Sequence, residues 1–383
     1  MMETWKEVRL NDFVWFQRGF DLPKTKFKAG NVPVYGSTSI LGYHNIAKVK
    51  APGIITGRSG TLGVMQYAKE DFWPHNTSLW VKDFKGNDEK FAYYLLQCLD
   101  FSLFNSGGAV PTLNRNVLNS FVINLPPLPT QRKIASILSA YDDLIENNLK
   151  RIKLLEEKAQ FTYEEWFVRL KFPGHENAKI DKETGLPEGW EKNNLVDCCD
   201  LTMGQSPKSE YYNDQGNGLP FHQGVKDYGF RFPENSSWST AGKRIAEANS
   251  ILFSVRAPVG RLNIANEKII LGRGLAAINH KKGWNNFLLY QLQKIFFEDN
   301  LMGGGAIFSS VTKKDVERIK LIHASEELTR QFNEIAFNID EAIKVLTKQN
   351  KSLKEARDIL LPRLMTGMID VEQMNLETLQ PAH

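Results

Sequence analysis

The sequence predicts two α/β (α+β) modules separated by two long helices that pair as an antiparallel coiled coil, in a pseudo-two-fold tandem repeat. The first observation is a seven-residue apolar period over residues 130–170, which is typical of a coiled-coil helix. The second is that this pattern returns near residue 325, with Ile134 and Phe332 198 positions apart. The third is an upstream repeat, in which Trp5 and Trp190 are 185 positions apart. One unit, a module followed by a helix, is therefore expected to occur twice.

The lengths of the helices and the positions of proline and glycine divide the chain further. At a rise of ~1.5 Å per residue, each long helix spans about 60 Å, too long for one compact domain, so it is interpreted as a spacer with a module at each end. The polar stretch 172–181 contains Pro-Gly and is expected to be a linker. The expected segments are a first module at 1–125, a first helical spacer at 126–172, a second module at 173–320, a second helical spacer at 321–370 and a tail at 371–383.

Composition is that of an ordinary globular protein. The 383 residues are 42% hydrophobic and 24% charged, with a net charge of +4, so nucleic-acid binding would have to come from local basic clusters. The cysteines Cys98, Cys198 and Cys199 form neither a disulfide framework nor a CxxC pair, which fits a reducing cytoplasm. No leader and no run of 18 apolar residues is present, so we expect a cytoplasmic protein without membrane contact.

The first module is expected to mix short strands with glycine-rich turns. Strands are predicted at 32–35 and 53–56, and a helix at 91–103. The most unusual loop is Gly57–Gly63, in which three glycines permit close backbone approach to a ligand and Arg58, Ser59 and Thr61 supply donors. It lacks the Lys-Ser/Thr end of a phosphate-binding P-loop. A DNA-facing loop and a plain turn both remain open.

Two further loops of the first module carry candidate DNA contacts. His75 and Asn76 lie between aromatic runs, and a side-chain amide can pair with an adenine edge. The glycine-rich stretch 105–115 ends in Arg115, and its Gly108 is matched by Gly305 before the second helix. The alternatives are a polar turn between strands and a simple glycine-rich connection.

Both long helices carry recognisable end signals. Thr130 is the predicted N-cap of the first helix, and Asn148, the one polar gap in its seam, is expected to fix the register with a specific partner helix. In the second helix, Pro362 should produce a kink or a stop, and Gly367 suits a C-cap. Four aromatic residues near the end of the first helix are expected to pack on the second module or to receive a partner subunit: Phe161, Tyr163, Trp166 and Phe167.

Three features together resemble the specificity subunit of a type I restriction-modification system. Residues 185–190 read Gly-Leu-Pro-Glu-Gly-Trp and open the second module, while 126–134 read Pro-Pro-Leu-Pro-Thr-Gln-Arg-Lys-Ile and open a long helix. The third feature is the duplication itself. The resemblance covers essentially the whole chain, although 321–325 departs from the proline-rich opening.

This resemblance implies a function in DNA recognition. Two target-recognition domains would each read one half of a split, asymmetric site in double-stranded DNA, and two methyltransferase (modification) subunits would dock on the helical regions. Those subunits would bring S-adenosylmethionine and methylate adenine. Restriction/translocase subunits would add cleavage that depends on ATP and Mg²⁺. The chain itself would bind no cofactor and no metal.

The second module contains loops similar to those of one class of these recognition domains. They occupy 203–213 and 218–227 and combine amides, hydroxyls, lysines and aromatic rings on glycine-proline turns. Residues 254–261 occupy the place of the Gly57–Gly63 loop, with Arg256 matching its arginine. Ordinary surface loops are the alternative. The candidate DNA contacts are Gln205, Ser206, Lys208, Tyr211, Tyr212, Gln223, Lys226, Arg256 and Arg261.

Catalytic motifs are mostly missing from the sequence. Residues 124–128 come nearest to a methyltransferase loop but contain an inserted leucine and no aromatic residue, and 83–85 resemble half of a nuclease site. Three hypotheses remain: a non-catalytic DNA-reading adaptor, a stand-alone modifying enzyme and a coiled-coil scaffold. The duplicated modules with differing loops favour the adaptor, in a restriction complex or in a complex that only methylates.

Overall fold

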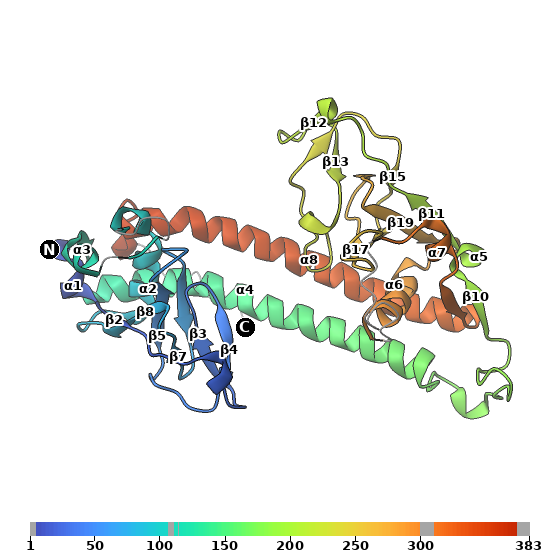
Figure 1. Ribbon diagram of the computed structural model, residues 1–383, viewed down its shortest axis with the longest axis horizontal. Coiled ribbons are helices and arrows are strands. Elements are labelled where there is room, and N and C mark those ends of the chain that lie inside the picture. The colour runs from blue at the N-terminus through green and yellow to red at the C-terminus, as the bar shows by residue number, and fades with distance from the viewer. Residues whose placement is uncertain (1–4, 106–110, 114, 299–309, 374–383) are drawn as a thin grey trace. The chain divides into compact units, whose positions relative to one another are not determined.

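The computed structural model describes residues 5–105, 111–113, 115–298 and 310–373 (Figure 1). The chain forms two compact units, unit 1 from residues 1–148 and 349–383 and unit 2 from residues 149–348. Both long helices, α4 (Leu128–Tyr163) and α8 (Glu326–Met365), contribute residues to each unit. The matched glycines Gly108 and Gly305 of the predicted repeat lie outside the described residues.

Unit 1 contains a two-stranded ribbon and two small sheets, and the strands predicted at 32–35 and 53–56 are confirmed. The ribbon pairs β1 (Lys6–Arg9) with β9 (Val122–Leu125). An antiparallel sheet has the order β2 (Trp15–Arg18), β8 (Ser78–Asp83), β5 (Gly53–Gly57) and β6 (Met65–Ala68). A mixed sheet has the order β4 (Ile40–His44), β3 (Val32–Tyr35) and β7 (Trp73–Pro74), with β3 and β7 parallel. The short helices are α1 (Leu10–Phe13), α2 (Glu89–Gln97) and α3 (Arg115–Ser120).

The core of unit 1 lies between its sheet and the helix pair. Phe13 and Phe91 are fully buried and pack edge to face, and they share a cluster with Ile134 of α4 and Leu364 of α8. Apolar residues at the seam positions of α4 therefore stabilise both the helix pair and the module. Burial of one such side chain contributes about 1.5–3 kcal/mol.

The two helices are antiparallel within unit 1. Asp142 contacts Arg357 and Asn148 contacts Asn350, so residue numbers rise along α4 as they fall along α8. The Nδ2 of Asn148 donates to Oδ1 of Asn350 at 2.9 Å, and both side chains are buried. The prediction that Asn148 occupies the seam opposite a specific partner helix of the same chain is confirmed.

Unit 2 repeats this plan with a larger second sheet. Its ribbon pairs β10 (Glu191–Asn194) with β20 (Lys320–His323). The antiparallel sheet has the order β11 (Cys199–Met203), β19 (Leu275–His280), β16 (Ile251–Ser254) and β17 (Leu262–Ile264). The mixed sheet has the order β12 (Tyr212–Asn213), β14 (Trp238–Ser239), β13 (Leu219–His222), β18 (Ile269–Leu271) and β15 (Ile245–Ala246). The short helices are α5 (Leu195–Cys198), α6 (Asn285–Gln293) and α7 (Lys313–Glu317).

Aromatic side chains join the helices of unit 2 to its module. Tyr163 and Phe167 are buried, and both contact Phe287 of α6 and Phe332 of α8. The packing predicted for these two aromatic residues is confirmed. Phe161, by contrast, remains 59% exposed.

The internal duplication is confirmed element by element. The ribbon strands β1 and β10 are separated by 185 positions, and β9 and β20 by 198. Helices α4 and α8 begin 198 positions apart, and α2 and α6 each contain nine residues. The four-stranded sheets match strand for strand, and the parallel pairs β3–β7 and β13–β18 are also equivalent.

Two helix boundaries differ from prediction. Helix α4 begins at Leu128, so Thr130 lies inside the helix and its hydroxyl donates to Glu372 Oε1 at 3.0 Å; the Gln131 amide already reaches the Pro127 carbonyl. Helix α2 ends at Gln97 because the Asp100 side chain accepts from the Ser102 amide and starts a separate 3₁₀ turn.

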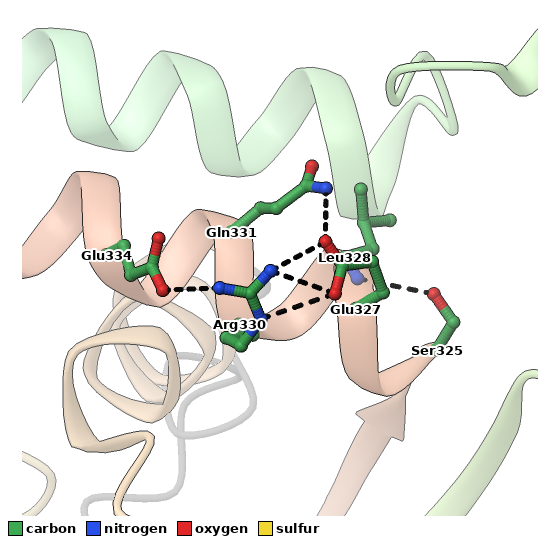
Figure 2. Close-up of polar contacts among 6 residues, drawn as sticks. All are labelled: Ser325, Glu327, Leu328, Arg330, Gln331 and Glu334. Atoms are coloured by element: carbon green, nitrogen blue, oxygen red, sulfur yellow. Dashed lines mark hydrogen bonds and ion pairs between the residues drawn. The ribbon is translucent and has the colours of Figure 1, made fainter.

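One of the two signals predicted for the end of α8 is confirmed: Gly367 lies just past the helix, but Pro362 does not stop it. The helix continues three residues past Pro362 to Met365, and Gly367 then adopts a φ of +70°, as a C-cap glycine should. At the start, the Ser325 hydroxyl accepts from the Leu328 amide (Figure 2). Arg330 forms ion pairs with Glu327, one turn before it, and with Glu334, one turn after it. Each such exposed pair contributes little to stability.

Candidate nucleic-acid interface

The sequence-predicted segments of unit 1 meet at one end of its sheets. The Arg58 amide, in the loop after β5, donates to the Thr77 carbonyl at 2.9 Å, so this loop adjoins the 75–77 turn between β7 and β8. The Leu113 amide donates to the Arg58 carbonyl at 2.9 Å, which brings in the described part of the 105–115 stretch. Ser37, in the turn after β3, donates to the carbonyls of Thr77 and Ser59.

Side chains in the 75–77 turn are held by local hydrogen bonds. His75 Nδ1 lies 3.0 Å from the Thr77 hydroxyl, and the His75 amide donates to the Tyr35 carbonyl. The Asn76 Nδ2 donates to Asp21 Oδ1. The turn therefore presents an amide side chain whose orientation is set by a neighbouring carboxylate.

Arg58 is only partly exposed. Its Nε is buried, and among the described residues no group accepts a hydrogen bond from it. Thr61 is exposed at the tip of the same loop, beside Gly60 with a φ of +84°. Arg115 begins α3, but its side chain lies outside the described part of the structure.

In unit 2, two distant loops meet at the corresponding end of the sheets. The Ser206 hydroxyl donates to Gln223 Oε1 at 2.7 Å and accepts from the Arg273 amide at 3.2 Å. The Gln205 amide donates to the Leu271 carbonyl, and its side chain is exposed. Gln205, Ser206 and Gln223, all predicted from sequence, therefore lie together.

Arg256 and Arg261 flank the hairpin between β16 and β17, and both side chains are exposed. The Arg261 amide donates to the Ser254 hydroxyl at 2.8 Å. Arg256, Gln223 and Ser254 line a groove of about 200 Å³. The predicted basic hairpin thus adjoins the Ser206–Gln223 pair.

The remaining predicted residues of unit 2 lie beside this cluster along the chain. Tyr212 stacks on Phe221 of β13 with ring centroids 4.6 Å apart, and its hydroxyl donates to the Pro207 carbonyl. Tyr211 is 40% exposed, Lys208 pairs with an adjacent glutamate at 3.6 Å and Lys226 is exposed. No described contact joins these four side chains directly to the Ser206–Gln223 pair.

The two clusters share one backbone framework. In unit 1 the Arg58 amide donates to Thr77 and its carbonyl accepts from Leu113. In unit 2 the Val255 amide donates to Gly274 and its carbonyl accepts from Val311, with the same geometry. The equivalent of the 75–77 turn is therefore the 272–274 turn, formed by Gly272, Arg273 and Gly274.

This framework corrects the match between the two arginines. Val255, not Arg256, is the counterpart of Arg58, and the isolated bridges Ser59–Thr112 and Arg256–Ser310 make Arg256 the counterpart of Ser59. A one-residue offset in extended chain reverses the side-chain direction, which explains why Arg58 is partly buried and Arg256 is exposed. The two arginines occupy matching loops but not matching positions.

Comparison with known proteins identifies the family. The model of the type I restriction modification DNA specificity domain matches residues 2–157 and 187–355. The chain belongs to this family. The putative MjaX specificity subunit of Methanocaldococcus jannaschii is 35% identical over 265 residues, which cover 68% of this chain and 62% of that relative. The MjaIX specificity subunit of the same organism is 27% identical over 74% of this chain and 70% of its own length.

A solved structure shows the same fold. The S subunit of a type I restriction-modification system from M. genitalium has a TM-score of 0.64 at 19% identity, covering 94% of this chain and 96% of that chain. Among the described helices of this family member, none is both long enough and apolar enough to cross a membrane.

Sequence reasoning missed three residues of the two clusters. Arg273 lies between two glycines, a pattern that echoes Gly57 and Arg58 but carries little information alone. Asp21 and Ser37 lie in ordinary-looking stretches, and only their contacts with the 75–77 turn and its neighbours reveal them. The signal available in sequence was the glycine-flanked arginine.

Proposed function

We propose that this chain is the DNA-reading specificity subunit of a type I restriction-modification complex. The observation that carries the proposal is the pair of loop clusters at equivalent positions of the duplicated modules. Their backbone frameworks match, while the side chains differ, with half-buried Asn76 in unit 1 at the position that exposed Arg273 occupies in unit 2. A shared scaffold with different polar side chains suits two modules that read two different half-sites.

Recognition follows from the chemistry of these loops. Basic side chains such as Arg256 and Lys226 bind phosphates and set the register, and this contribution weakens with salt. Amide and guanidinium groups read base edges in the major groove. The paired helices fix the distance between the half-sites and dock two methyltransferase subunits.

The chain acts without a catalytic site of its own in this proposal. S-adenosylmethionine belongs to the methyltransferase subunits, and ATP and Mg²⁺ belong to restriction/translocase subunits where these are present. The complex works on double-stranded DNA in the cytoplasm. Membership of the specificity family supports this division of labour.

The direct test is methyl transfer from S-adenosylmethionine into mixed-sequence DNA by the candidate partner methyltransferase, with and without this chain. We expect methylation only when the chain is present, at a split motif. Methylation by the chain alone would reveal an active site, and an unchanged pattern with the authentic partner would favour a scaffold.

Substitution of the two loop arginines tests the clusters. Arg58→Ala and Arg256→Ala are each expected to weaken DNA binding by the complex. A change confined to one half-site would indicate base reading, whereas uniform weakening would indicate a phosphate contact. Unchanged affinity in both variants would remove these residues from the interface.

The spacer role has its own test. Insertion of one heptad into α4 together with one into α8 keeps the seam in phase, so we expect a longer unspecified gap between unchanged half-sites. The methylated motif measures that gap. An unchanged gap in a folded, active complex would contradict the spacer role.

A further inference from the structure

The two matched turns carry different polar side chains at their central position. Equivalent hydrogen bonds fix both turns. The Gly19 and Gly204 amides donate to the carbonyls of the first residues of β8 and β19. The His75 and Gly272 amides donate to the carbonyls of the last residues of β3 and β13. The central residues are Asn76 and Arg273. The backbone therefore holds two chemically different groups at one equivalent place.

Arg273 is the only residue of its turn with a side chain. A Cβ at Gly272 would lie 2.6 Å from the Gln223 Cα, and one at Gly274 would lie 2.5 Å from the Gln223 carbonyl oxygen. Close approach to Gln223 thus requires both glycines. The Arg273 backbone is held by Ser206, while its side chain is exposed and pairs with no group among the described residues.

The hydrogen bond that orients Asn76 uses only one of the polar groups of its side-chain amide. One N–H of Nδ2 is directed at Asp21 Oδ1. The second N–H and the side-chain carbonyl oxygen have no partner among the described residues. An adenine edge in the major groove needs one donor and one acceptor from an amide, and these two groups supply them.

We propose that these turns determine one base in each half-site, with Arg273 reading a guanine and Asn76 reading an adenine. An arginine fork donates two hydrogen bonds to O6 and N7 of guanine, and an asparagine amide pairs with N6 and N7 of adenine. The fixed turn sets the backbone position of both residues, and the bond to Asp21 also orients the Asn76 amide, so this part of the conformational freedom is not lost on binding. This assignment rests on the proposed function and adds the identity of the reading residues.

The test uses the complete complex of this chain with its methyltransferase partner on random-sequence DNA, with base frequencies read at every position of the methylated motif. We expect Arg273→Gln to reduce the preference for guanine at one position by about 10- to 100-fold and to leave the other half-site unchanged. Asn76→Ala should relax one adenine in the opposite half-site.

Two further variants make the result decisive. Arg273→Lys keeps the charge but loses the planar fork, so it should retain methylation while relaxing the same guanine. Arg318→Gln removes an exposed charge elsewhere in unit 2 and should leave the motif unchanged. Unchanged base frequencies in Arg273→Gln, or weakening that is uniform across sequences in both Arg273 variants, would overturn the assignment. Absence of chain-dependent methylation in the wild type would contradict the proposed function itself.

Discussion

Units 1 and 2 hold an equivalent aspartate and tyrosine with arginines from different parts of the chain. In unit 1, Asp142 accepts from the Tyr94 hydroxyl and from Arg357 of α8, both at 2.5 Å. In unit 2, the aspartate 198 positions later is Asp340, and its arginine is Arg231, 3.4 Å away, from the loop before β14.

The surroundings of the two arginines differ as well. Arg231 is 4% exposed and also contacts Glu156 and the Tyr290 hydroxyl, each at 3.0 Å, whereas Arg357 remains 25% exposed. Burial raises the pKa of Asp340, and Arg231 opposes that rise. The aspartate and the tyrosine therefore occur at equivalent positions in both units, whereas the arginine that balances the aspartate comes from a different part of the chain in each unit. Unit 2 thereby ties its module to its helices through a buried cluster.

The largest expected effect comes from breaking this buried cluster. Arg231→Met leaves Asp340 buried without its cation, so we expect a loss of about 3–5 kcal/mol in the free energy of unfolding of unit 2. Arg357→Met is the matched control in unit 1 and should cost about 1 kcal/mol or less, because its pair is partly solvated. Urea unfolding monitored by tryptophan fluorescence measures both. Equal losses would contradict the contrast between the clusters.

The second prediction tests the equivalence of the two frameworks. A Cβ at Gly19 would lie 2.0 Å from the His75 carbonyl oxygen, and one at Gly204 would lie 2.1 Å from the Gly272 carbonyl oxygen. Gly19→Ala and Gly204→Ala should each cost about 1–3 kcal/mol through overpacking against backbone. Gly224→Ala meets no atom within 4 Å and should change thermal stability little. Tolerance of alanine at only one of the first two sites would break the equivalence.

The third prediction concerns the polar seam position of unit 1. Asn148→Leu leaves Asn350 buried without its partner and should cost about 1–2 kcal/mol. Adding Asn350→Leu to this variant should restore or raise stability, because two leucines replace two polar groups in an apolar seam. A double-mutant cycle from urea unfolding checks the coupling. Additive losses in the double variant would show that the two amides do not interact in solution.

The last prediction contrasts the ends of β8 and β19, and its effect is absent at neutral pH. Asp83 Oδ1 accepts from the Lys85 amide, and His280 Nδ1 accepts from the Lys282 amide in the equivalent turn. Burial, with nearby positive groups, lowers the pKa of His280 to about 4. Between that value and an unfolded pKa near 6.5, the unfolded chain binds a proton that the folded chain excludes, so stability falls as pH falls.

This pH dependence is checked by unfolding curves between pH 7 and pH 4. His280→Asn keeps an acceptor in place of Nδ1 but does not titrate, so its stability should fall less steeply than that of the wild type. Asp83→Asn should leave the slope above pH 5 unchanged, since the pKa of Asp83 is lowered and its contribution is lost only at lower pH. Parallel curves for wild type and His280→Asn would exclude a titrating His280.

Much of the fold was predictable because it depends on periodicity. The heptad pattern located α4 and α8, and the spacing between Trp5 and Trp190 revealed the duplicated ribbon. Boundaries were less accurate where a tertiary contact decides them, as at Thr130, whose hydroxyl bonds a residue far along the chain. Periodicity reports which face is buried, not what caps an end.

The candidate site was predictable at the level of loops but not of positions. Arg58 and Arg256 were matched by a shared pattern, although strand register offsets them by one residue. Arg231 carried no local signal, since Glu156 and Asp340 lie far from it in sequence. Arg273 could not be singled out from sequence, because the reason for the two glycines beside it, their close contact with Gln223, is a tertiary contact.

The central claim is that equivalent loop clusters of the two units contact the two half-sites. Photocross-linking of the complete complex to DNA that carries the methylated motif, with 5-iodouracil at successive positions, tests it most directly. One half-site should yield adducts within residues 57–63 and 75–77, and the other within 205–206, 223–226, 254–261 and 272–274. Adducts from both half-sites on a single unit, or adducts outside both clusters, would contradict the account.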